Sequence, residues 1–146
     1  MEIGVGLDAS LGLSFGEQAE LSQEAARLGY TSIWTPEGPG HDAFQVCVQR
    51  WAASRQVAPE GIATGIAVSP VMYRTPMALA MSGGTVSSLT DGKFFMGIGS
   101  GGAHRPDARR SLGLPRLSAM SMMRDYLSIL RPLLAGERVD YEGPVA

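Results

Sequence analysis

Cysteine is almost absent from this sequence of 146 residues, which contains Cys47 and no other. A single thiol cannot form an intrachain disulfide, and it falls short of the cysteine pairs found in the usual zinc sites. Cys47 stands among apolar residues at helical spacing, which favours a small buried hydrophobe over a reactive thiol. The sequence therefore predicts neither a disulfide-stabilised fold nor a metal site.

Charge and long apolar runs are scarce as well. Charged residues make up 18% of the chain, the net charge is −2 and there is no basic block, so nothing indicates a nucleic acid or an anionic membrane surface as partner. No apolar stretch approaches the roughly 20 residues of a membrane span, and the first residues lack the charged and apolar regions of a secretory signal. We therefore expect a cytoplasmic protein without a membrane partner.

Glycine, in contrast, is plentiful, and four of the 19 glycines lie within residues 97–102. They follow Phe94–Ile98, a continuously apolar run that is typical of a strand buried on both faces. Glycines let the backbone turn sharply and approach a ligand closely, and α/β proteins bind ligands in loops at the carboxyl ends of strands. The loop therefore predicts a cofactor contact through Gly97, Gly99, Ser100 and Gly101.

The rest of the chain alternates strand and helix signals. Strands are expected at 2–7, 31–35, 61–68 and 94–98, and helices at 14–28, 43–55, from 75 onward and over 120–134. Residues 103–117 read as a long polar loop, and 137–141 fit one more short strand. Since each crossover contains a helix, the four βα units predict parallel strands.

The glycines leave two other interpretations open. Gly97-x-Gly99-x-x-Gly102 matches the dinucleotide-binding fingerprint, but that fingerprint runs straight into a helix, and here Pro106 and Pro115 intervene. A Rossmann-type site and a purely structural glycine turn both remain alternatives.

Several spaced segments together resemble the luciferase-like monooxygenase superfamily, and within it the oxidoreductases that use the deazaflavin coenzyme F420. These segments span almost the whole chain: Trp34–Phe44, Gly65–Pro70, Tyr73–Pro76, Asp91–Phe94, Gly97–Gly101 and Leu133–Gly143.

The resemblance implies a (β/α)8 TIM-barrel fold, which typically needs about 250 residues. Residues 1–146 are therefore expected to form a single partial domain, the first four βα units or N-terminal half-barrel. The implied activity is hydride transfer between the deazaflavin C5 and a small organic substrate, and we expect the half-barrel alone to show weak activity or none. An FMN-dependent luciferase-like monooxygenase and a non-catalytic half-barrel binding or assembly module are the alternatives.

The resemblance also suggests individual site residues. In the family the third strand carries a non-proline cis peptide against the cofactor ring, which falls near Ile66-Ala67 here, with Gly65 adjacent. Related sugar-phosphate dehydrogenases place an acid–base histidine after strand two, where this chain has Pro36-Glu37, and a glutamate after strand four, where it has Gly102.

Glu37 is therefore the candidate acid–base residue, and His41 and His104 are weaker candidates. The alternatives are that Glu37 only accepts backbone amides in its turn and that the histidines are surface or capping residues.

A half-barrel would leave strand edges unpaired and its inner face uncovered. We therefore expect a homo-oligomer, most simply a two-fold dimer, or part of a longer chain. The side chains expected on the inner face are Ile3, Val5, Ile33, Ile66, Val68, Phe95 and Ile98.

Overall fold

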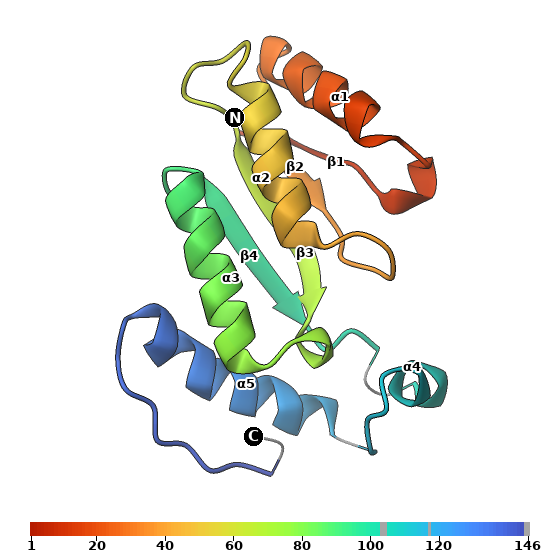
Figure 1. Cartoon of the computed structure of the whole chain (residues 1–146), viewed down its shortest axis with the longest axis vertical. Coiled ribbons are helices and arrows are strands. Elements are labelled where there is room, and N and C mark those ends of the chain that lie inside the picture. Colours follow the sequence, from red (N-terminus) through yellow and green to blue (C-terminus); the bar gives the residue numbers. More distant parts are fainter. Residues whose placement is uncertain (103–104, 117, 145–146) are drawn as a thin grey trace. The chain divides into compact units, whose positions relative to one another are not determined.

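The structure, a computed structural model, describes residues 1–102, 105–116 and 118–144. Its helices and strands follow one another in the predicted βα order (Figure 1). The sheet elements and the helices between them are β1 (Gly4–Gly6), α1 (Phe15–Arg27), β2 (Ser32–Thr35), α2 (Ala43–Ser54), β3 (Ala63–Pro70), α3 (Pro76–Leu89) and β4 (Phe94–Gly99). They are followed by α4 (Pro106–Ser111) and α5 (Ala119–Leu134), and short 3₁₀ turns occur at Ala9–Leu11 and Val71–Tyr73.

The strands form one sheet in the order β1-β2-β3-β4. The pairs β1–β2 and β2–β3 are parallel, with Gly6 opposite Trp34 and Trp34 opposite Gly65. A parallel sheet in chain order needs helical crossovers, and the helices between the strands supply them. The α/β prediction with four βα units is confirmed.

Local signals in the sequence explain where the first two helices begin. The Ser14 hydroxyl accepts the Glu17 amide at 3.2 Å while the Glu17 carboxylate accepts the Ser14 amide at 2.8 Å, which completes the predicted capping box. The Asp42 carboxylate accepts the amides of Phe44 and Gln45 and so begins α2.

The chain divides into two compact units. The first contains Met1–Ser69 and Thr85–Gly97, and the second contains Pro70–Gly84 and the residues from Ile98 onward.

In the first unit, one face of the sheet is covered by helices. Ile33 of β2 packs with Leu7, Ile62 and Ala25 of α1 in a buried cluster, and Figure 1 shows α1 and α2 side by side over the strands. Ile66 of β3 is also fully buried. The expectation that Ile33 and Ile66 point to the inner face is therefore wrong, because side chains alternate along a strand and these two point toward the helices.

The opposite face, which we call the open face, carries an aromatic pair. The ring of Trp34 stacks on that of Phe95 at 5.5 Å between centroids. A Cβ atom at Gly65 would lie 2.5 Å from the indole ring, so glycine is what lets the indole lie flat on the neighbouring strand. The Phe95 side chain is 54% exposed and Val68 is 43% exposed.

The second unit is held together by tyrosine hydroxyls on α5 and the C-terminal segment. The Tyr126 hydroxyl donates to the Arg74 carbonyl at 2.9 Å, and the Tyr141 hydroxyl donates to the buried Asp125 carboxylate at 2.8 Å. Residues 137–141 lie against α5 in this way without strand structure, so the strand predicted there is wrong.

The structure also departs from the loop prediction for this unit. The expected loop 103–117 contains the short helix α4, so it is more ordered than predicted. Pro132 lies inside α5, which ends two residues later at Leu134. No helix in the described part of the chain is both long and apolar enough to span a membrane.

Candidate functional site

Polar segments follow the carboxyl ends of β1 and β2 in the first unit. The segment after β1 runs through Asp8 to Gly12, and the segment after β2 runs from Pro36 to Asp42. Parallel strands bring such segments to the same edge of a sheet. This edge holds Glu37 and His41, the two predicted catalytic residues.

Glu37 connects three parts of this edge. Its side chain is buried at 8% exposure; one carboxylate oxygen accepts the Ser69 hydroxyl at 2.5 Å, and the other accepts the Ala43 amide at 3.3 Å. Its own amide donates to the Val68 carbonyl at 3.4 Å. The carboxylate thus ties the β2–α2 loop to the end of β3 and to the first turn of α2.

This placement bears on both interpretations of Glu37. The contact with the Ala43 amide is the kind of backbone contact that the structural interpretation expects, although the amide belongs to α2 and not to the turn itself. A buried carboxylate that accepts a serine hydroxyl is also suited to proton transfer. Its catalytic role remains a prediction.

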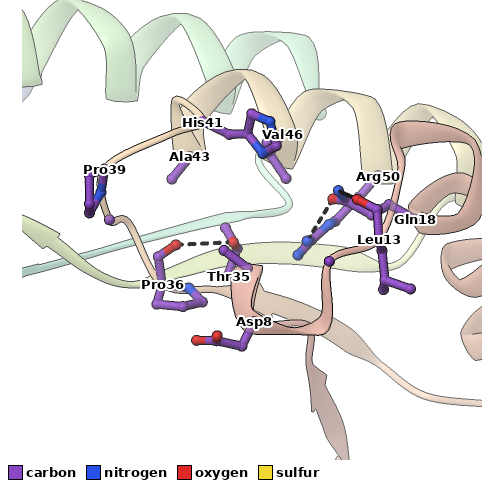
Figure 2. A pocket seen from close by; sticks show the side chains of 13 residues that line it. Asp8, Leu13, Gln18, Thr35, Pro36, Pro39, His41, Ala43, Val46 and Arg50 are labelled. Atoms are coloured by element: carbon purple, nitrogen blue, oxygen red, sulfur yellow. Dashed lines mark hydrogen bonds between the residues drawn. The ribbon is translucent and has the colours of Figure 1, made fainter.

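His41 is exposed, and its ring lies 4.7 Å from that of Phe15, tilted by 47°. It lines a cavity of about 220 Å³ on the helix side of the sheet edge, together with Asp8, Gln18, Thr35 and Arg50 (Figure 2). Glu37 is not among the described residues that line this cavity. The weaker candidate His104 lies outside the described residues.

Arg50 is the residue of this cavity that the sequence analysis missed. It projects from α2, is 4% exposed, and donates to the Leu7 carbonyl at 3.3 Å and to the Gln18 side-chain oxygen at 2.9 Å. A third hydrogen bond reaches the Trp34 carbonyl at 3.4 Å. Burial lowers the pKa of the guanidinium, because desolvation disfavours the charged form. The sequence feature that could have identified Arg50 is its place between Cys47 and Trp51 in a mostly apolar helix.

Cys47 lies on the same helix and is inert. Its side chain is 1% exposed, and burial raises the pKa of the thiol to about 12. The predicted small buried hydrophobe is confirmed. Among the described residues, no three histidine, cysteine, aspartate or glutamate side chains gather as a metal site would require.

The predicted cofactor residues of β3 lie around a cis peptide bond. The bond joins Ala67 and Val68, one residue later than expected. Ala67 is exposed, whereas the Ile66 side chain is fully buried. Ile66 therefore offers only its backbone to a ligand on the open face, and Gly65 lies beneath the Trp34 ring.

Gly97 faces this segment from β4. A Cβ atom there would collide with the Ile66 carbonyl oxygen and would lie 3.4 Å from Val68 Cγ1. Glycine at this position thus permits the close approach of two strands, and its cofactor contact remains a prediction.

The other predicted glycines belong to the second unit. Gly101 has a φ of 57°, and a Cβ atom there would collide with the ring of Pro70. Gly102 follows with a φ of 76°. The turn after Gly99 and Ser100 therefore requires glycine for its conformation, which is compatible with the structural alternative and leaves cofactor contact a prediction.

Comparison with known proteins identifies the family of this chain. A family model described as luciferase-like monooxygenase matches residues 2–145. The chain is 30% identical over 142 residues to a Mycobacterium tuberculosis protein named "Putative coenzyme F420-dependent oxidoreductase", covering 94% of this chain and 39% of that protein. It thus spans about two fifths of this relative's length.

Solved structures share the fold. Coenzyme F420-dependent tetrahydromethanopterin reductase from Methanopyrus kandleri superposes with a TM-score of 0.78 at 18% identity, covering 97% of this chain and 42% of the reductase. The oxygenating constituent of 3,6-diketocamphane monooxygenase from Pseudomonas putida, solved with FMN, superposes with a TM-score of 0.79 at 21% identity over 100% of this chain and 43% of its own.

Proposed function

Because the chain belongs to the luciferase-like monooxygenase family, we propose that it forms part of an oxidoreductase that uses the deazaflavin coenzyme F420 and acts on a small organic substrate. The observation that carries the proposal is the open face of the first unit, which presents the exposed Ala67 and Val68 side chains toward the carboxyl end of β3. The name of the M. tuberculosis relative favours the deazaflavin.

The open face fits a planar cofactor. Gly6 lies opposite Trp34 in the sheet, and a Cβ atom at Gly6 would meet nothing within 4 Å. Ala67 is exposed, and Val68 presents a half-exposed apolar side chain. Cofactor pockets are typically lined by apolar and aromatic side chains together with a few backbone polar groups.

The chain's own residues would serve this chemistry in distinct ways. When bound, the deazaflavin supplies the hydride-carrying carbon. Ala67 and Val68 would contact the ring and exclude water, Gly65 would hold the Trp34 indole beside them, and Glu37 would hold or move a proton through its carboxylate. Gly99, Ser100 and Gly101 stay predicted cofactor residues on the strength of the family resemblance.

FMN is the alternative cofactor, since a protein of the same fold was solved with FMN. Parallel fluorescence titrations of the purified protein with F420 and with FMN distinguish the two. We expect the dissociation constant to be lower for F420 by tenfold or more, about 1.4 kcal/mol. Tight FMN binding without an F420 response would refute the choice of cofactor, and no response to either would favour the assembly module.

A matched pair of variants tests where the cofactor binds. Val68→Glu places a charge on the open face, whereas Leu28→Glu makes the same kind of change at an exposed leucine at the end of α1. We expect Val68→Glu to weaken binding about tenfold or more, because an uncompensated charge beside an apolar ring is costly, and Leu28→Glu to leave it unchanged. Equal effects would place the cofactor elsewhere.

A further inference from the structure

The cavity lined by Arg50 is independent of the open face and of the proposed redox chemistry. Thr35 and Val46 contribute to its walls from the helix side of β2 and from α2, whereas Trp34 points to the open face. We infer that this cavity binds a small carboxylate, and that Arg50 holds it.

The charge on Arg50 has only neutral partners. Its three hydrogen bonds go to two backbone carbonyls and one amide oxygen, and within the described part of the chain it forms no ion pair with a carboxylate. A buried cation normally has an anionic partner, because removing it from water costs several kcal/mol. An anion in the cavity would supply that partner.

The Arg50 guanidinium also has more N–H donors than hydrogen-bond acceptors around it. Arginine carries five N–H donors, and the Nε–H of Arg50 is buried without a hydrogen-bond partner. Nε and Nη2 form one edge of the group, which matches the two oxygens of a carboxylate. The Gln18 side chain now bonds Nη2, and a side-chain amide can rotate away where a backbone carbonyl cannot.

The size and charge of the cavity restrict the ligand. A volume of about 220 Å³ corresponds to roughly seven water molecules at about 30 Å³ each, which suits a carboxylate of a few non-hydrogen atoms. Asp8 lines the same cavity, and its hydrogen bonds with Ser10 lower the pKa of its carboxyl. A second negative charge on the ligand would meet this carboxylate, so the site favours a monoanion.

Nuclear magnetic resonance can test the site without any mutation. Sodium acetate is titrated into ¹⁵N-labelled protein at constant ionic strength set with sodium chloride, and the arginine Nε–H resonances are followed. We expect the Arg50 resonance to shift along a saturating curve. Arg55 is the internal control, because it lies next to α2 and its Nε–H already donates to the Pro59 carbonyl at 3.0 Å. A parallel titration with sodium phosphate should give a smaller shift at equal concentration.

Two conservative variants of α1 make the test specific. Gln18→Glu places a tethered carboxylate beside Arg50, so we expect it to abolish the acetate response by occupying the site. Gln23→Glu is the same change on the same helix, at a half-buried position whose side-chain amide donates to Gln56, and should leave the response intact. An unmoved Arg50 resonance, equal shifts at Arg50 and Arg55, or a full response in Gln18→Glu would each overturn the inference.

Discussion

Glu37 fixes the β2–α2 loop and is also the proposed acid–base residue. Its carboxylate joins Ser69 at the end of β3 to Ala43 at the start of α2, so the β2–α2 loop has a fixed shape. A carboxylate held in this way has little freedom to move. Any proton it exchanges would pass through a group already at hydrogen-bond distance, and the Ser69 hydroxyl is such a group.

The variant Glu37→Gln tests the proton-transfer role. Glutamine keeps an oxygen for the Ala43 amide but cannot act as a base, so we expect turnover to fall by tenfold or more while cofactor affinity changes little. The unfolding free energy should fall by about 1–3 kcal/mol, because a hydrogen bond to a buried charge is lost. Turnover is measured with the cofactor that the titrations select.

The exposed Glu20 of α1 provides the control for that experiment. Glu20→Gln makes the same chemical change at an exposed side chain, and should retain both turnover and stability. Wild-type turnover in Glu37→Gln would remove Glu37 from the mechanism and leave it as a structural residue.

Some residues of the candidate site could be predicted from the sequence and others could not. Glu37 could be selected because it follows a strand in a Pro/Gly-rich loop, where ligand-binding groups gather. The Ile66 side chain could not be excluded from the open face, because a continuously apolar strand hides which residues point to which side. Arg50 was missed because its partners Leu7 and Gln18 lie far from it in the sequence.

At the scale of secondary structure, local chemistry decided what could be predicted. The helix starts at Ser14 and Asp42 follow from capping groups within three residues. Helix α4 also had local signals, since Pro106 is its first residue and Arg109 and Arg110 lie in its last turn. Pro106 was interpreted as an interruption when it marks a helix start.

The false strand at residues 137–141 has a different cause. Its alternating pattern is compatible with a strand, but a strand needs a neighbour to pair with. In the structure the segment is instead fixed by the bond between Tyr141 and Asp125. Such a tertiary contact cannot be read from periodicity.

The close approach of β3 and β4 can be tested at Gly97. Gly97→Ala would push a methyl group into the Ile66 carbonyl, and we expect a loss of about 1–3 kcal/mol in urea unfolding, as overpacking typically costs. Gly6→Ala on β1 is the matched control, because a Cβ atom there meets nothing within 4 Å. Equal stability of the two variants would show that β3 and β4 are not in this contact.

For the molecule as a whole, the open face is the dominant feature. Phe95 and Val68 leave much of their apolar surface in water, and large exposed apolar patches mark surfaces that other protein covers. We therefore predict that the 146-residue chain associates with itself at micromolar concentration, which sedimentation velocity measures directly.

Paired variants identify the surface responsible for association. Phe95→Glu should shift the chain toward the monomer, because it places a charge on the open face. Leu28→Glu, at a leucine that is 67% exposed on α1, should sediment like the wild type. A wild-type chain that stays monomeric throughout this concentration range would contradict the prediction.

The stacking of Trp34 on Phe95 has an optical consequence. The chain has two tryptophans, and they lie in opposite environments: Trp34 belongs to the open face, whereas Trp51 is 7% exposed with the Arg55 guanidinium 4.9 Å from its ring centre. Emission from Trp51 is therefore fixed by the folded interior. The emission wavelength and collisional quenching of Trp34 change when another molecule covers the open face. Trp51 therefore serves as an internal reference for the fluorescence change of Trp34.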